Sequence, residues 1–251
     1  MIFLGTAGWA LSQPHADHFP REGSQLERYA SGLNAVEINR SFYRPHRPAT
    51  YARWAEAVPA DFRFCVKLPK AITHERRLVA CDAALEAFLD GCGKLGQRLG
   101  CLLVQLPPSL AFDPALVEAF LRALRARHEG GVVIEPRHRS WQQAQPLLDD
   151  LRIARAAVDP SRFTGDDRPS GWPGLVYWRL HGTPRVYYSD YTASWLDAFT
   201  GRLLDSAAAG VPVWCIFDNT AAGAALGNAL SMRLRLQAQP DQTFVPPRPL
   251  L

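Results

Sequence analysis

Short apolar runs recur along the whole chain and predict eight β-strands. Most of them are almost continuously apolar, as in "GCLLVQL" and "VPVWCIFDN", instead of alternating between apolar and polar residues. This pattern is typical of parallel strands that are covered by other structure on both faces. The eight runs span residues 2–8, 35–39, 62–68, 100–106, 132–135, 153–159, 175–182 and 211–219.

Helical patterns fill most of the gaps between these runs. The stretch "DPALVEAFLRALRARH" begins with Asp113 as the expected N-cap and Pro114 in the first turn. We expect Asn219 or Thr220 to cap the helix that follows the eighth strand. Residues 160–174, after the sixth strand, are rich in Pro, Gly and Asp and predict a loop in place of a helix.

Alternating strands and helices over 251 residues predict an α/β fold. We expect a (β/α)8 TIM-type barrel in which a loop replaces the helix after the sixth strand, and a doubly wound open sheet is the alternative. The loops that leave the strands are often longer than those that enter them, which favours the barrel. No low-complexity linker divides the chain, so residues 1–251 are expected to form a single TIM-barrel-like domain.

Seven of the eight runs end on polar or ionisable side chains. The carboxyl ends of barrel strands meet at one mouth, so we expect a functional site there. A ring of structural salt bridges that closes the top of the barrel is the alternative. The side chains concerned are Glu37, Asn39, Lys67, Gln105, Glu135, Asp159, Arg179, His181, Asp218 and Asn219.

Four of these side chains are the candidates for catalysis. Glu37 and Glu135 have the chemistry of a general acid and base or of metal ligands, and they suit a structural role beside arginines equally well. Lys67 lies between apolar neighbours, where desolvation would lower its pKa and suit Schiff-base or general-base chemistry. A buried ion pair of Lys67 with Glu37 or Glu135 is the favoured alternative. His181 precedes Gly182, which would let a substrate approach the backbone closely.

A second set of residues is expected to bind the substrate. Aromatic side chains in loops at the same end offer faces for a sugar or a nucleobase, although packing of the loops explains several of them equally well. The loops after the seventh and eighth strands of barrels commonly hold phosphate, and "HGTPR" contributes Arg185 there. The predicted substrate-binding residues are Asn39, Tyr43, His74, Gln105, Arg137, His138, Trp141, Arg179, Asp218 and Asn219.

The charge and the cysteine content limit the kinds of protein to which this chain can belong. The chain has 25 arginines, three lysines and a formal net charge of +4. Arginine binds phosphate bidentately, but a compositional bias explains the excess equally well. The five cysteines are scattered without a C-x-x-C pair, which predicts reduced thiols and no zinc cluster. We expect a cytoplasmic protein, because we find no charged leader and no apolar run of about 20 residues that could cross a membrane.

Seven segments, in this order, resemble the YecE-like family, also known as domain of unknown function 72. They are "GTAGW", "VEINRSFYRPH", "FRFCVKLPKAITH", "LLVQLPPS", "IEPRHRSW", "YWRLHG" and "FDNTAAGAALGNA". The resemblance implies a TIM-barrel-like fold and no particular activity. Two features depart from the family pattern: "ALSQPHADHF" lacks an aromatic-rich form, and Asp218 stands where a second Asn is expected.

These observations predict an enzyme that acts on a phosphate-bearing substrate, namely a nucleotide, a sugar phosphate or a nucleic acid. A hydrolase or a lyase or isomerase would suit the carboxylate, lysine and histidine groups. The alternative is a non-catalytic nucleic-acid-binding protein, which the position of many arginines on outer helices weakens. A catalytic metal is not favoured, because arginine and lysine already supply positive charge at the mouth. The expected partner is an anionic small molecule or a nucleic acid.

The stretch "GGVVIEPRHRSW" allows a geometric prediction. Glu135 and Arg137 are two residues apart, so both should point into the mouth, whereas Arg139 should be solvated. An unpaired buried carboxylate is costly, so Glu135 should contact a basic side chain of another strand, and the candidates are Lys67, Arg179 and His181. Trp141 should pack back onto the protein.

Overall fold

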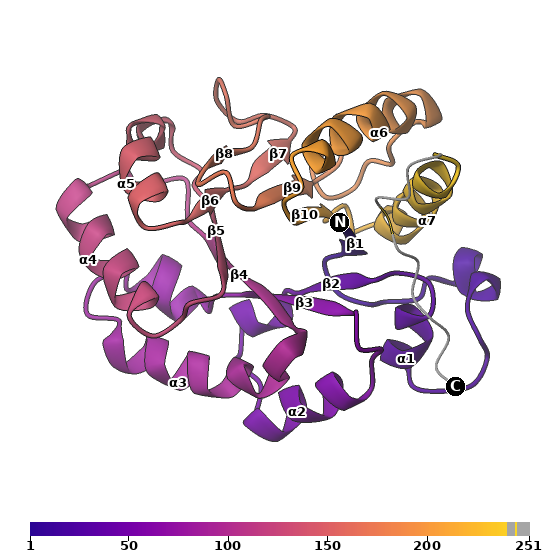
Figure 1. Ribbon diagram of the computed structural model, residues 1–251, viewed down its shortest axis with the longest axis horizontal. Helices are drawn as coiled ribbons and strands as arrows, with labels where there is room; N and C mark the ends of the chain where they lie inside the picture. The colour runs from indigo at the N-terminus through magenta and orange to yellow at the C-terminus, as the bar shows by residue number, and fades with distance from the viewer. Residues whose placement is uncertain (240–243, 245–251) are drawn as a thin grey trace.

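The predicted apolar runs form strands, and helices connect most of them. The computed structural model describes residues 1–239 and 244 (Figure 1), so the end of the predicted domain of residues 1–251 lies outside the described residues. The strands are β1 (Ile2–Thr6), β2 (Ala35–Ile38), β3 (Arg63–Lys67), β4 (Leu99–Gln105), β5 (Gly131–Glu135), β6 (Ala154–Arg155), β7 (Ala157–Asp159), β8 (Ser170–Gly171), β9 (Val176–Leu180) and β10 (Val213–Phe217). The helices are α1 (Gln25–Ala30), α2 (Pro48–Glu56), α3 (Asp82–Cys92), α4 (Pro114–Arg125), α5 (Gln145–Asp150), α6 (Ala193–Ala208) and α7 (Ala224–Gln237). Shorter helical turns are η1 (Gln13–His18), η2 (Arg40–Phe42), η3 (Ala71–Glu75), η4 (Gly93–Arg98) and η5 (Arg139–Ala144).

The strands form two sheets, with the orders β1-β10-β9-β7 and β2-β3-β4-β5-β6-β8. Every pair is parallel except β6 with β8. The predicted α/β fold with parallel strands is therefore confirmed. The strands of the described chain do not form the single closed sheet expected of a barrel, because the backbone ladder is interrupted at two places. Residues 160–174, all of them described, contain β8 and no helix, as predicted.

The first interruption lies in the predicted sixth strand. It divides at Ala156 into β6, which pairs with β5, and β7, which pairs with β9. The amide of Ala156 still donates to the carbonyl of Ile134 at 2.9 Å, but the amide of Val158 donates to Asp166 in the following loop at 2.7 Å. The chain therefore passes from one sheet to the other within three residues.

The second interruption lies between β1 and β2, where side chains take the place of backbone partners. The Asn34 amide accepts from the Leu4 N–H at 2.8 Å and donates to the Ile2 carbonyl at 2.9 Å. The Tyr29 hydroxyl accepts from the Thr6 N–H at 2.9 Å and donates to the carbonyl of the first residue of β2 at 3.1 Å. Beyond the end of β1, one parallel bridge joins Ala7 to β2. Three backbone groups of β1 that face β2, namely the amides of Leu4 and Thr6 and the carbonyl of Ile2, are thus satisfied without a ladder.

The two faces of the strands pack into two different cores. A large core lies between the strands and the helices, and Figure 1 shows α2, α3 and α4 outside β3 to β5 and shows α6 and α7 beside β9 and β10. A smaller core takes its side chains from strands of both sheets. We call it the inter-sheet core, and its members are Ala35, Cys65, Cys101, Leu103, Val133, Ala154, Ala156, Leu175, Tyr177, Trp214 and Ile216. Successive side chains of a strand alternate between the two cores, so the near-continuous apolar runs are explained.

One of the two predicted helix caps is confirmed, and the other is wrong. The Asp113 carboxylate accepts from the amides of Ala115 and Leu116 at 3.1 and 3.2 Å, so this N-cap is confirmed. The predicted cap of the last helix is wrong, because α7 begins after Gly223, whose φ is +81°. Four residues separate Asn219 from that helix start, and its side chain binds elsewhere.

Gly5 generates a test of the close approach between β1 and β2. A Cβ at this position would lie 2.0 Å from the carbonyl oxygen of Ala35, a backbone atom. We expect Gly5→Ala to lower the free energy of unfolding by more than the ~1–3 kcal/mol of ordinary overpacking, measured by guanidinium denaturation. Gly201→Ala in α6 is the matched control, since a Cβ there meets no atom within 4 Å and the helix should gain about 0.5–1 kcal/mol. Equal stability of the two variants would contradict the assignment.

Candidate functional site

The predicted strand-end side chains lie directly beyond the inter-sheet core. Glu37 follows Ala35 by two residues on β2, and Arg179 follows Tyr177 by two residues on β9. The same step of two leads from the inter-sheet core to Lys67, Gln105, Glu135 and Asp218. Side chains two apart on a strand share a face, so the period that builds the core also brings these polar groups to the carboxyl ends of the strands. All of them are buried.

Arg179 is the centre of this group, and three carboxylates surround its guanidinium. Glu37 accepts from Nε at 2.9 Å and from Nη2 at 2.8 Å in a bidentate pair. Glu135 accepts from Nη1 at 2.9 Å, and an Asp218 oxygen lies 3.0 Å from Nη2. We call these four residues the carboxylate–arginine cluster. Arg179 was expected to bind an anion, but its guanidinium faces carboxylates of the protein itself.

The electrostatics of the cluster favour its ionised form. Burial alone would raise the pKa of Glu135, but Arg179 and Arg137 outweigh it and hold that pKa well below its ordinary value. Burial likewise opposes ionisation of Asp218, and Arg179 with His181 lowers its pKa. The pKa of Arg179 is raised well above its ordinary value, because the three carboxylates outweigh the burial of the guanidinium. An ionised Glu135 suits an anchoring role better than that of a general acid.

His181 lies between two of the carboxylates. Its Nδ1 is 2.9 Å from an Asp218 oxygen, and its Nε2 is 3.6 Å from Glu135 and has no hydrogen-bond partner among the described residues. Asp218 therefore orients the ring and directs Nε2 toward Glu135. The neighbouring Gly182, with a φ of +89°, does not serve the approach of a substrate to its backbone. A Cβ there would lie 2.6 Å from the carbonyl of Ser189, so packing between loops requires this glycine.

Lys67 differs from the expected ion-paired lysine. No carboxylate of the described chain lies within 4.0 Å of its Nζ, which stands 4.2 Å from the centre of the Phe42 ring. The predicted pair with Glu37 or Glu135 is wrong, because both carboxylates are bound by Arg179. Burial and the nearby Arg179 lower the pKa of Lys67 to about 8, against the opposing effect of the carboxylates.

His74 contacts the same Phe42 ring as Lys67 does. Its ring meets the Phe42 ring edge-on at 4.8 Å, and its Nδ1 is 2.8 Å from the Thr73 hydroxyl. Burial lowers the pKa of His74, and the charges of Lys67 and Arg137 lower it further. His74 is therefore neutral at neutral pH, with Nε2 left for another group.

Arg137 bridges the cluster to the loop after β9. Its Nε donates to Glu135 at 2.9 Å and its Nη2 donates to the Tyr187 hydroxyl at 3.0 Å, whereas Nη1 has no hydrogen bond to the described residues. The geometric prediction for this stretch is confirmed: Glu135 is buried beside Arg179, Arg137 points to the same group, and Arg139 is exposed. Trp141 is buried and donates from its indole N–H to the Leu110 carbonyl at 3.0 Å, so it packs back onto the protein as predicted.

Other predicted binding residues have mainly local partners. The Gln105 amide donates to the Leu106 carbonyl, and His138 caps η5 through Ser140. Asn219 donates to the Ser189 carbonyl at 2.9 Å and to Asn228 at 2.8 Å, so it joins the loop after β9 to α7. This bonding ties the two predicted phosphate loops to each other. Arg185 of the same loop stacks on the exposed Tyr188 ring at 3.8 Å.

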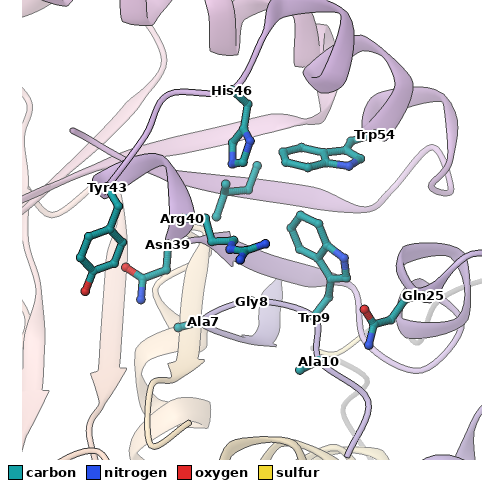
Figure 2. A pocket seen from close by; sticks show the side chains of 11 residues that line it. Ala7, Gly8, Trp9, Ala10, Gln25, Asn39, Arg40, Tyr43, His46 and Trp54 are labelled. Carbon is teal, nitrogen blue, oxygen red and sulfur yellow. The ribbon is translucent and has the colours of Figure 1, made fainter. Parts of the chain in front are cut away.

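Asn39 and Tyr43 lie in a cavity beside the cluster. The cavity has a volume of about 370 Å³ and opens at the carboxyl ends of β1 and β2. Figure 2 shows Trp9, Trp54 and His46 on one side of it and Asn39 and Tyr43 on the other. The Trp9 and Trp54 rings meet edge-on at 4.8 Å. None of the four residues of the carboxylate–arginine cluster lines this cavity, so the cavity and the buried charges are neighbouring parts of one strand-end surface.

Sequence reasoning missed two tyrosines of the site. Tyr177 donates to Glu37 at 2.9 Å and to the Cys65 sulfur at 3.3 Å, and Tyr187 supports Arg137. The signal for Tyr177 was present, since it precedes Arg179 by two residues and so shares its face. Tyr187 was not among the predicted site residues. Its φ of +71° is rare for a non-glycine residue, and no sequence pattern indicated it.

Two negative findings concern the described residues alone. Within residues 1–239 and 244, no three His, Cys, Asp or Glu side chains are grouped so as to hold a metal ion. The carboxylates of the site converge on Arg179 instead. In the same part of the chain, none of the helices combines the length and the apolar character needed to cross a membrane.

Arg179→Met tests the importance of the cluster. Removal of the guanidinium leaves three buried carboxylates without their main partner, and we expect a loss of about 3–5 kcal/mol in the free energy of unfolding. Arg235→Met is the matched control, because Arg235 pairs with the exposed Asp197 at 2.7 Å and should contribute no more than about 1 kcal/mol. Guanidinium denaturation at pH 7 measures both. Equal losses would show that the cluster does not stabilise the fold.

The depressed pKa of Glu135 and of Asp218 predicts the acid sensitivity of the fold. Each carboxyl binds its proton less readily in the folded state, so its contribution is fully present above the ordinary pKa values of 4.5 and 3.8 and is lost as the pH falls through the folded values. We expect stability to fall below about pH 4.5, with each group contributing up to ~1.4 kcal/mol per pH unit. Glu135→Gln should be less stable at pH 7 and show a shallower decline in acid. A decline as steep as that of the wild type would exclude Glu135 as its source.

The chain is similar to two curated proteins from bacteria. The UPF0759 protein YecE of Escherichia coli (strain K12) is 35% identical over 141 residues, which cover 55% of this chain and 49% of that protein. The UPF0759 protein YunF of Bacillus subtilis (strain 168) is 30% identical over 152 residues, which cover 56% of this chain and 52% of YunF. The chain thus matches about half the length of these curated relatives.

Solved structures extend the likeness to the whole fold. The crystal structure of a DUF72 family protein from Enterococcus faecalis V583 has a TM-score of 0.78 and 25% identity and covers 95% of this chain and 98% of its own. A DUF72 family protein from Thermotoga maritima MSB8 has a TM-score of 0.76 and 22% identity, with 94% and 99% covered. Residues 3–250 also match the family described as "Protein of unknown function DUF72". The chain therefore belongs to the DUF72 family, as the resemblance of its motifs predicted.

Proposed function

We propose that this protein is an enzyme that acts on a phosphate-bearing substrate at the carboxyl ends of its strands. The substrate is a nucleotide, a sugar phosphate or a nucleic acid. The observation that carries the proposal is the set of cationic and polar groups left over once the carboxylate–arginine cluster is satisfied. Among the described residues, Lys67 has no ion pair with a carboxylate and Nη1 of Arg137 has no hydrogen bond. Both groups are cationic hydrogen-bond donors, so an anion is the kind of ligand that would bind to both of them.

The roles of the other residues follow from this arrangement. Arg179 and its three carboxylates form a rigid support that fixes the position of Arg137 through Glu135. His181, which Asp218 orients, carries protons in the reaction, and Lys67 contributes its buried amine. The cavity beside the cluster, with the rings of Trp9 and Trp54, accommodates an apolar or planar part of the substrate.

We also propose that the strands and helices form a single (β/α)8-like domain. The two sheets follow one another around the inter-sheet core, with the chain crossing between them at Ala156 and a bridge from Ala7 to β2. The carboxyl ends of the strands then form one mouth, where enzymes of this architecture carry their sites. We further propose a cytoplasmic location, because all five cysteines are free and buried.

The arginines on the outer helices argue against non-catalytic nucleic-acid binding. Arg125 donates to the carbonyls of Leu151, Gly130 and Arg152 at the ends of neighbouring elements. Arg233 donates to the Gly32 carbonyl at 2.8 Å. Arg122, Arg127 and Arg235 form ion pairs with nearby carboxylates. These guanidiniums stabilise local structure, so their number is not evidence for a phosphate-binding face.

Arg137→Gln tests the proposed anion site. A sugar phosphate, a nucleoside monophosphate and a short single-stranded oligonucleotide are titrated by calorimetry, with inorganic phosphate as competitor. At least one should bind, and Arg137→Gln should weaken its binding about 10–100-fold, the effect of a lost hydrogen bond to a charged group. Arg235→Gln on α7 is the matched control and should bind as the wild type does. Binding of none of the three probes, or equal binding by Arg137→Gln, would overturn the proposal.

A further inference from the structure

Lys67 is unlike the other two lysines of the chain. Lys70 forms an ion pair with Glu75 at 3.0 Å and is 45% exposed, and Lys94 is exposed. Lys67 is only 6% exposed, and its Nζ has the Phe42 ring as its neighbour and no carboxylate of the described chain within 4.0 Å. A buried amine without a fixed ion pair keeps its lone pair available once it loses a proton.

The charges around Lys67 come from every side of the site. Glu37 lies on β2, Glu135 on β5 and Asp218 after β10, and all three favour the ammonium form. Burial, followed by Arg179 on β9, favours the neutral amine more strongly and lowers the pKa to about 8. At pH 7 about a tenth of the molecules then carry the unprotonated amine, against about four in ten thousand for an ordinary lysine.

We propose that Lys67 forms an imine with the carbonyl group of a phosphate-bearing aldehyde or ketone. This inference deepens the proposed function and rests on it, because the phosphate would bind Arg137 while the carbonyl meets Nζ. The amine lies just below the surface, where Phe42, His74, Arg137 and Tyr187 are all partly exposed. The proposed ligand would enter between these side chains to meet the amine.

His74 carries the proton that is transferred during imine formation. The neutral ring takes one proton from the Lys67 ammonium through Nε2, since Nδ1 is engaged by Thr73. The amine then attacks the carbonyl carbon, a C–N bond forms, and the π electron pair moves to the oxygen, which takes a proton from the nitrogen. His74 returns its proton to the hydroxyl, which departs as water, and the iminium retains the single positive charge of the original ammonium.

The charge of the product explains why a carbonyl compound fits this site better than an acyl donor. Three carboxylates surround Arg179, and Lys67 and Arg137 supply the remaining cations of this group. An iminium on Lys67 preserves this balance, whereas an amide would remove one positive charge beside buried carboxylates. The carboxylates that hold Arg179 thus also stabilise the proposed intermediate.

Reductive trapping in a variant with a single lysine tests the proposal. Lys70→Arg and Lys94→Arg are combined, and the protein is treated with glycolaldehyde phosphate and cyanoborohydride. Besides the adduct of the N-terminal amine, we expect one lysine adduct, mapped to Lys67 by peptide mass spectrometry, with a rate that rises with pH around a midpoint near 8. Lys67→Arg in the same background should give no adduct beyond the N-terminal amine, and its thermal unfolding confirms that it folds. Failure of Lys67 to react, or reaction at the rate of Lys70 and Lys94 in the wild type, would overturn the proposal.

A second probe separates this proposal from the proposed function. Glycolaldehyde without the phosphate should modify Lys67 at least tenfold more slowly, and inorganic phosphate should inhibit only the phosphorylated probe. Equal rates for the two probes would retain the imine and remove the phosphate site. Competitive binding of glycolaldehyde phosphate without an adduct on Lys67 would retain the phosphate site and remove the imine.

Discussion

The bidentate pair between Arg179 and Glu37 is the interaction on which the site depends. With Glu37 fixed on one side of the guanidinium, the remaining donors can only face Glu135 and Asp218. Each of these carboxylates then positions one further group: Glu135 holds Arg137, and Asp218 holds His181. A buried charge that loses its partner is strongly destabilising, so the geometry of these ion pairs follows from how one guanidinium is satisfied.

The cluster also connects the two sheets. Arg179 lies on β9 in the first sheet, whereas Glu37 and Glu135 lie on β2 and β5 in the second. The backbone ladder is interrupted on both sides of this arrangement, at Ala156 and between β1 and β2. Ion pairs at the carboxyl ends and apolar side chains in the inter-sheet core therefore hold the two sheets against each other.

The sequence predicted the strands and the group of polar side chains well, because both depend on local patterns. An apolar run followed by a polar residue marks a strand and its carboxyl end, and the period of two identifies which side chains share a face. The partners could not be predicted, since Glu37 and Arg179 are 142 residues apart and meet only through the order of the strands. For the same reason Lys67 was assigned a carboxylate that Arg179 binds instead. Gly182 was misread because its close neighbour, Ser189, belongs to a loop whose path no pattern indicates.

The junction between β1 and β2 has a consequence for how this fold can vary. Backbone ladders are made of groups that every residue carries, so substitutions along them leave the pairing pattern in place. Asn34 and Tyr29, by contrast, supply the bonds at this junction from their side chains. A substitution at either position therefore removes hydrogen bonds that hold the first two strands together. At this junction the contact between strands depends on the identity of two residues, whereas a laddered pair depends only on the path of the backbone.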